Sequence, residues 1–146
     1  MNFVEEPKQR VLDEELERRA VEFHGHGGPF MTVGLRMGLY TLEHLDCKGW
    51  FDLSCRAMLR WRPPDSCVID GIQSSTGCTM GKRNIEVVEG DGISATFSSR
   101  DSSVTLTLRK EVLNKVESGL EDEEATREMM EWLGGAAAKE LFEVRG

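Results

Sequence analysis

The sequence predicts a single α+β domain: helices come first, strands follow, and a helix closes the chain. Apolar residues recur at helical spacing near both ends, and they alternate with polar residues in the middle. A chain of 146 residues is long enough to bury one hydrophobic core without disulfides or a structural metal. Hydrophobic residues make up 39% and charged residues 30%, which is typical of a folded domain. We therefore expect residues 1–146 to form one domain.

Two helices are expected in the first third of the chain. A first amphipathic pattern covers about residues 8–23, where the apolar positions are Leu12, Leu16, Ala20 and Phe23. A second helix is expected to begin at Pro29, because proline is well tolerated in the first helical turn. Its apolar face consists of Met31, Leu35, Leu39, Leu42 and Leu45. Gly34 and Gly38 would let another backbone approach this helix, either within the chain or from a second copy.

The middle of the chain changes period. Residues 50–61 alternate between apolar and polar positions, which predicts a half-buried strand that ends before Pro63 and Pro64. The following segment CVIDGIQSS can be a short helix or a strand. We favour the helix, because Asp65 or Ser66 can cap it and a glycine-rich loop follows it. A helix would place Cys67, Asp70 and Ser74 on one face, with Gln73 pointing elsewhere.

The last third is expected to contain strands and one helix. Residues 85–97 resemble a hairpin with its turn at Gly90, Asp91 and Gly92, and residues 104–108 alternate as a further strand. The sheet is therefore expected to be mostly antiparallel. The acidic run EDEE is expected to open the final helix, because acidic residues suit a helix N-terminus. One stripe of that helix contains Met129, Met130, Leu133, Ala137 and Leu141.

Composition excludes some classes of function. A net charge of −8 argues against a nucleic-acid-binding protein, since phosphate contacts require clustered Lys and Arg. No apolar run is long enough to span a membrane, and the charged first residues do not resemble a signal peptide. We therefore expect a cytoplasmic protein. The four cysteines are expected to be thiols or metal ligands rather than disulfides.

Two segments carry residues suited to chemistry. His24 and His26 lie in FHGHGGP, where flanking glycines would let both rings face one point, as metal ligands or as capping and packing groups. Cys67 and Cys78 flank a polar segment that contains Asp70, Gln73 and Thr76. Backbone amides near Gly77 and Gly81, with Lys82 and Arg83, could bind an anion. The alternative is a polar loop whose hydroxyls satisfy their own turn.

Together these segments resemble the FmdE family, which is named for the E subunit of formylmethanofuran dehydrogenase. The resemblance rests on FHGHGGPFMTVGLRMG at residues 23–38 and CVIDGIQSSTGCTMGKRNI at residues 67–85, which follow the family pattern almost position by position. It implies an α+β core domain that pairs into an intertwined homodimer, without the C-terminal zinc ribbon of some members. The family name also implies a link to a molybdenum or tungsten oxidoreductase of methanogenesis, and with it a molybdopterin-related ligand.

The resemblance also implies a bound transition metal, usually zinc. It makes His24, His26, Cys67 and Cys78 the expected metal ligands. The residues that it places around the pocket are Asp70, Gln73, Thr76, Thr79 and Lys82. The chain departs from the family pattern at Gly28, where the family has a cysteine.

Three hypotheses follow. The first is a metal-binding accessory protein of a molybdenum or tungsten enzyme. The second is an enzyme acting on a small anionic substrate, with Cys78 as nucleophile or ligand and with a depressed thiol pKa. The third is a non-catalytic dimer whose site has degenerated through Gly28.

Overall fold

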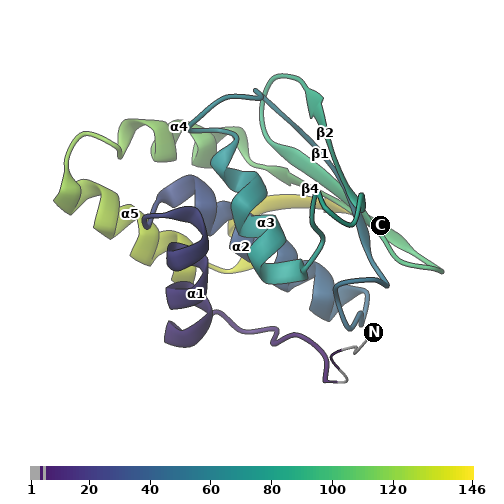
Figure 1. The fold of residues 1–146 in the computed structure, drawn as a ribbon. Coiled ribbons are helices and arrows are strands. Elements are labelled where there is room, and N and C mark those ends of the chain that lie inside the picture. Colours follow the sequence, from purple (N-terminus) through teal and green to yellow (C-terminus); the bar gives the residue numbers. More distant parts are fainter. Residues whose placement is uncertain (1–3, 5) are drawn as a thin grey trace.

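Five strands form one mixed sheet, and helices gather on one side of it (Figure 1). The computed structural model describes residue 4 and residues 6–146. The helices are α1 (Glu14–His24), α2 (Pro29–His44), α3 (Cys67–Thr76), α4 (Lys110–Ser118), α5 (Glu123–Gly135) and α6 (Ala138–Leu141). The strands are β1 (Ser54–Leu59), β2 (Ile85–Glu89), β3 (Ser94–Ser98), β4 (Ser103–Leu108) and β5 (Phe142–Arg145). The predicted α+β class and the mostly antiparallel sheet are confirmed.

The sheet order is β2-β1-β3-β4-β5, and β1 pairs in parallel with β2. Helix α3 supplies the crossover that a parallel pair requires. The predicted hairpin over residues 85–97 is therefore wrong, because β1 lies between β2 and β3. The turn at residues 90–92 and the alternating pattern on both sides of it are real. The alternating pattern does not reveal, however, that β1 lies between β2 and β3 in the sheet.

One face of the sheet is buried under the helices. Along β1, Cys55, Ala57 and Leu59 are buried, while the intervening side chains are exposed. The predicted strand over residues 50–61 is shorter than expected, and Phe51 and Trp61 at its ends are exposed. The antiparallel part of the sheet thus has one buried face and one solvent-exposed face, as is common for such sheets.

Helix α1 begins later than the sequence pattern indicates. Asp13 is the N-cap, and its side chain accepts a hydrogen bond from the Leu16 amide at 2.9 Å. The predicted start near residue 8 is wrong, because the Lys8 amide bonds the Lys48 carbonyl instead of a helical partner. The helix ends at Gly25, whose φ of 102° is readily adopted only by glycine.

Helix α2 is the central helix of the fold, and 12 of its 16 residues are buried. It packs backbone to backbone against α3. A Cβ added at Gly34 would lie 2.0 Å from the Val68 carbonyl oxygen, and one added at Gly71 would lie 2.1 Å from the Met31 oxygen. Gly34 therefore serves packing within the chain. Within the described part of the chain, no helix is long and apolar enough to cross a membrane.

The C-terminal region contains more elements than the sequence pattern indicates. The predicted final helix ends at Gly135, and α6 and β5 follow it, so the expected stripe from Met129 to Leu141 crosses a break at Ala136. Asp122, within the acidic run, caps α5 by accepting a hydrogen bond from the Ala125 amide. The sequence analysis also missed α4, whose nine residues bury only Val112 and Val116.

Arg36 connects α2 to the end of α5. Its guanidinium donates to the Leu133 carbonyl at 2.5 Å and to the Ala136 carbonyl at 2.7 Å. We expect Arg36→Met to lower the free energy of unfolding by about 2 kcal/mol, because a charged donor to two carbonyls is lost. Urea denaturation measures this change. Arg18→Met is the control, since Arg18 makes only exposed ion pairs with Glu15 and Glu22. Equal stability of the two variants would contradict the assigned role of Arg36.

Candidate functional site

The candidate site is built around a contact between the end of α1 and the first turn of α3. His24 is the last residue of α1, and Asp70 lies in the first turn of α3. The His24 Nδ1 and Asp70 Oδ2 atoms are 2.5 Å apart. An ionised carboxylate only accepts hydrogen bonds, so the Nδ1–H group donates to it. The two sequence motifs therefore meet at this pair.

The second ring nitrogen of His24 is left without a partner. The His24 side chain is only 9% exposed, and its Nε2 atom is buried with no hydrogen bond among the described residues. In the neutral ring with a proton on Nδ1, this Nε2 carries a lone pair. A buried polar atom without a partner is uncommon in a folded protein. It therefore marks a position where a ligand of His24 could bind.

His26 lies beside His24. The two ring centroids are 4.7 Å apart. The His26 Nδ1 atom lies 2.9 Å from the Gly27 carbonyl oxygen, which only accepts, so this nitrogen also carries the proton. The Nε2 atom of each ring thus carries a lone pair. The predicted proximity of the two histidines is present in the structure.

Gly28 borders this histidine pair. It is the N-cap of α2, and its extended backbone, with φ of −160°, suits any residue. A Cβ added at Gly28 would lie 3.4 Å from the His26 Cε1 atom, which is ordinary van der Waals contact. The cysteine that the family has at this position would therefore fit, with its side chain beginning against the His26 ring. Its replacement by glycine removes a thiol next to the two histidines.

The two predicted cysteine ligands lie at opposite ends of α3. Cys67 is the first residue of α3, one turn before Asp70, and Cys78 follows its last residue, Thr76. Ten helical residues span about 15 Å, so one ion cannot contact both cysteines within one chain. Burial first, and then Asp70 and Asp65, raise the pKa of the Cys67 thiol. Only Cys67 is on the Asp70 side of α3.

Cys78 is a buried thiol in the core. Its side chain is fully buried, and its Sγ atom lies 3.4 Å from the Leu53 carbonyl oxygen, to which it donates. Burial raises the pKa of this thiol, although a hydrogen bond with Thr76 and the charge of Lys82 act in the opposite direction. The depressed pKa that a nucleophilic Cys78 would need is therefore absent. Across residues 4 and 6–146, no three His, Cys, Asp or Glu side chains are grouped so as to hold a metal ion.

Several motif residues have structural roles. The fully buried Thr76 hydroxyl donates to the Ile72 carbonyl at 2.6 Å and accepts from the Cys78 amide. The Asn84 side chain donates to the Trp50 and Leu53 carbonyls and accepts from the Thr79 amide. These bonds fix the loop between α3 and β2. The hydroxyl of Thr76, which the resemblance predicts as a pocket residue, is thus engaged in bonds to the backbone around the end of α3.

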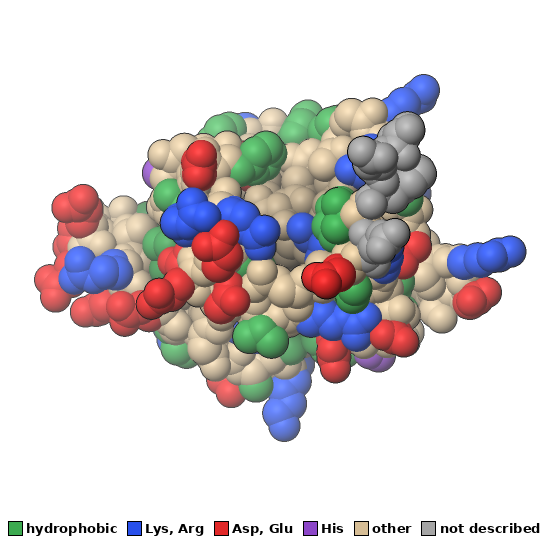
Figure 2. Space-filling view, turned by 60° about the horizontal axis from the view of Figure 1, so that its bottom comes forward, with side chains coloured by type: hydrophobic (Ala, Val, Ile, Leu, Met, Phe, Trp, Pro, Cys, Tyr) green, Lys and Arg blue, Asp and Glu red, His purple; other side chains and the backbone are tan. Residues whose placement is uncertain are grey.

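A recess of about 210 Å³ opens beside the histidine pair. We call it the cationic recess; the residues that line it are Lys8, Leu16, Arg19, Phe23, Gln73, Ser74 and Thr79. Gln73 joins it to the histidine pair, because its Nε2 atom donates to Asp70 Oδ1 at 3.4 Å. Gln73 therefore lies on the Asp70 face of α3, and the prediction that it points elsewhere is wrong. Figure 2 shows Lys and Arg side chains gathered around a hollow on one face.

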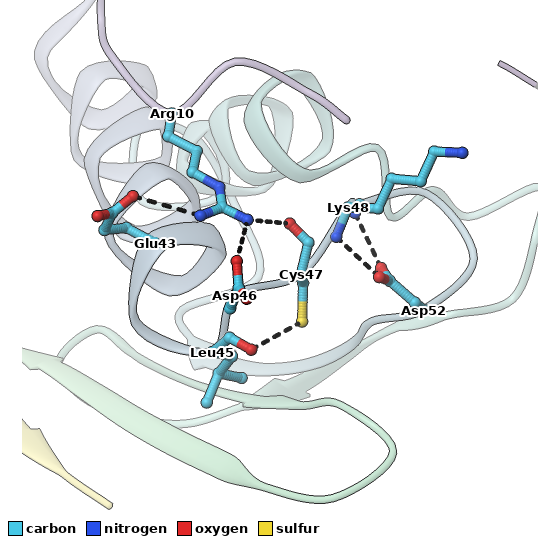
Figure 3. Close-up of polar contacts among 8 residues, drawn as sticks. Arg10, Glu43, Leu45, Asp46, Cys47, Lys48 and Asp52 are labelled. Carbon is cyan, nitrogen blue, oxygen red and sulfur yellow. Dashed lines mark hydrogen bonds and ion pairs between the residues drawn. The ribbon is translucent and has the colours of Figure 1, made fainter. Parts of the chain in front are cut away.

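The N-terminal segment supplies one wall of the cationic recess. Arg10 anchors this segment through ion pairs with Glu43 at 3.4 Å and Asp46 at 2.8 Å, and it also donates to the Cys47 carbonyl (Figure 3). Asp52 accepts hydrogen bonds from the Lys48 and Gly49 amides, and these bonds fix the loop over residues 48–52. These contacts hold Lys8 in place. No motif contains Lys8 or Arg19, so sequence analysis did not identify them.

Positive charge accumulates in the cationic recess. Burial lowers the pKa of Lys8, and the nearby charges of Arg19 and Lys82 lower it further. Lys8 Nζ lies 5.1 Å from the centre of the Trp50 ring, and Lys82 Nζ donates to Thr79 Oγ1 at 2.9 Å. Among the described residues, neither lysine has a carboxylate within ion-pair distance. The recess therefore favours a negatively charged ligand.

Two known proteins are similar to this chain. A curated protein of Archaeoglobus fulgidus, described as a probable S-adenosyl-L-methionine-binding protein, is 37% identical over 68 residues. The match covers 46% of this chain but only 19% of that protein. The crystal structure of a tungsten formylmethanofuran dehydrogenase FmdE-like protein from Syntrophus aciditrophicus has a TM-score of 0.60 and 19% identity. The structural match covers 90% of this chain and 70% of the Syntrophus chain, and at this identity it supports the fold alone.

A family model extends over most of the chain. The model, described as FmdE, Molybdenum formylmethanofuran dehydrogenase operon, matches residues 23–143. This range contains both motifs, the His24–Asp70 contact and the whole sheet except its last two residues. The sequence-based resemblance is confirmed, and the chain belongs to the FmdE family.

Proposed function

We propose that this protein is a metal-binding accessory protein that resembles the E subunit of formylmethanofuran dehydrogenase. Its ion would be zinc or a similar divalent transition metal, held by the Nε2 atoms of His24 and His26. One observation carries the proposal: Asp70 fixes the His24 ring so that a buried Nε2 is left without a partner. Metal-binding histidines commonly donate their other N–H group to a carboxylate in this way.

The residues present fit such an ion in chemical type. Imidazole nitrogen is a preferred ligand of zinc and of other late transition metals. The two histidines supply two ligands, and water or a bound anion can fill further positions. Cys67 lies on the same side of α3 as Asp70. Cys78 is buried in the core, where its thiol donates to a backbone carbonyl, and its role as a metal ligand stays a prediction. When bound, the ion would supply a Lewis acid, while Asp70 orients the His24 ring.

A zinc titration of metal-free protein tests the proposal. We expect one equivalent of zinc to bind the wild-type protein, and each of His24→Ala and His26→Ala to bind roughly 100-fold more weakly. Asp70→Asn should weaken binding by about 10–100-fold, because the ring is no longer held in its tautomer. The control is His44→Ala, since His44 lies at the end of α2, where it stacks on Tyr40.

Two outcomes would contradict the metal site. One is wild-type protein that binds no zinc above background. The other is His24→Ala protein that binds zinc as tightly as the wild-type and His44→Ala proteins do. Circular dichroism of each variant without metal shows whether the fold is retained, so that loss of binding is not confused with unfolding.

The protein is further proposed to act as a homodimer and to associate with a molybdenum or tungsten oxidoreductase. The family description and the name of the structural relative support the association with such an oxidoreductase. Exposed Met58 and Trp61 support the homodimer, because large apolar side chains at the surface often mark contacts with a partner. Light scattering would give twice the chain mass of 16.4 kDa if the dimer forms. A single-chain mass at all concentrations would contradict it.

A further inference from the structure

The cationic recess has a chemistry that the metal proposal does not use. Lys8 and Arg19 both line the recess, and Lys82 Nζ lies 2.9 Å from the hydroxyl of Thr79, which also lines it. Arg19 is only weakly neutralised: its nearest carboxylate atom, on Glu15, is 3.8 Å away, and it also donates to Gln9 at 2.8 Å. Such a cluster is unfavourable unless an anion lies nearby. It is maintained in a chain whose net charge is −8.

Hydroxyl groups complement these charges. Ser74 lines the recess, and its Oγ atom is shielded from solvent without any hydrogen-bond partner in the described chain. Thr79 Oγ1 accepts from the Lys82 backbone and side-chain nitrogens, at 3.3 and 2.9 Å. The Thr79 hydroxyl proton is therefore free to be donated. Two hydroxyl donors and two cations line the recess, and Lys82 lies next to it through Thr79. These groups match the acceptor oxygens of a phosphate group.

We propose that the cationic recess binds the phosphate group of a small molecule. A volume of about 210 Å³ equals roughly seven liquid-water volumes of about 30 Å³ each, which exceeds the space that one phosphate group needs. The apolar side of the recess, formed by Leu16 and Phe23, would contact the remainder of the molecule. Phe23 is 58% exposed, so this side is open to a ligand that enters from solvent.

This binding site is independent of the metal proposal. Neither His24 nor His26 lines the recess, and Gln73 joins the recess to Asp70, while its Oε1 atom is held by the Met80 amide at 3.0 Å. Phosphate binding therefore does not require an ion at the histidines. Titrations on metal-free protein in the presence of a chelator keep the two proposals separate, because phosphate cannot then bind through zinc.

Isothermal titration calorimetry at constant ionic strength tests the proposal with three probes: inorganic phosphate, adenosine 5′-monophosphate and adenosine. We expect saturable binding of both phosphate compounds and none of adenosine. Tighter binding of the monophosphate would identify a phosphorylated organic molecule as the ligand, and equal binding would identify free phosphate. Lys8→Gln and Lys82→Gln should each weaken binding by about tenfold or more, because each removes a charged donor.

Lys110→Gln is the matched control, because it removes the same charge from α4 at an exposed position outside the recess. We expect it to bind phosphate as the wild-type protein does. The Lys8 and Lys82 variants should melt no lower than wild type in phosphate-free buffer, since each relieves repulsion within the cluster. The proposal is overturned if wild type shows no saturable binding of either phosphate compound. It is also overturned if all three lysine variants bind equally.

Discussion

Gly34→Ala is expected to lower the free energy of unfolding by about 3 kcal/mol or more, the largest effect on stability that we predict. The added Cβ would lie 2.0 Å from the Val68 carbonyl oxygen and 2.9 Å from the Ile72 nitrogen, both of which are backbone atoms of α3. A backbone cannot move aside as a flexible side chain can. The two helices must therefore separate, and the core between them loses its packing.

Chemical denaturation followed by circular dichroism measures this effect, and Gly135→Ala is its matched control. An added Cβ at Gly135, the last residue of α5, meets nothing within 4 Å. Because alanine is favoured over glycine in helices, Gly135→Ala should leave stability unchanged or raise it by up to about 1 kcal/mol. If Gly34→Ala protein denatured at the same midpoint as Gly135→Ala protein, the close contact between α2 and α3 would be refuted.

Gly28→Cys is expected to strengthen zinc binding by roughly 100-fold. A Cβ at this position fits 3.4 Å from the His26 ring, so the new thiol would be added next to the two imidazoles. Structural zinc sites with four ligands contribute about 10–16 kcal/mol of binding free energy, or about 3 kcal/mol for each ligand. One added thiolate would therefore account for about two orders of magnitude. Competition with a chromogenic chelator measures the affinity.

Two controls separate a true third ligand from the general affinity of a new thiol for zinc. Gly28→Ser has nearly the same shape but no thiolate, and Gly135→Cys places a thiol on α5 at an exposed position. Neither should strengthen binding as Gly28→Cys does. A clear gain by Gly28→Cys alone would support the hypothesis that the site has degenerated at this position. If Gly28→Cys and wild type bound zinc equally, residue 28 would only shape the turn.

The local patterns predicted most helices and strands but not their partners. Proline at residue 29 and glycine at residue 77 mark real helix boundaries, because their backbone preferences act over one or two residues. The pairing of β1 with β2 depends on where α3 places the chain, which no alternating pattern contains. Helix α4 and strand β5 were missed because their apolar residues are few and their packing partners are distant in sequence.

The candidate site was predicted only in part. In the structure, contacts connect the motif residues His24, His26, Asp70 and Gln73, although the helical pattern placed Gln73 on another face. The motifs did not show that α3 separates Cys67 from Cys78 by its full length, which is a consequence of helix geometry. Lys8 and Arg19 belong to neither motif, and the position of Lys8 depends on how Arg10 anchors the N-terminal segment (Figure 3).

The most direct test of the metal site is the protonation of the two imidazole rings. Long-range ¹H–¹⁵N spectra of protein labelled at histidine distinguish a protonated ring nitrogen from one with a free lone pair. We predict that metal-free His24 carries its proton on Nδ1, and that zinc shifts the Nε2 resonances of His24 and His26 while those of His44 stay in place. A proton on His24 Nε2, or unchanged His24 and His26 signals after saturation with zinc, would contradict the account.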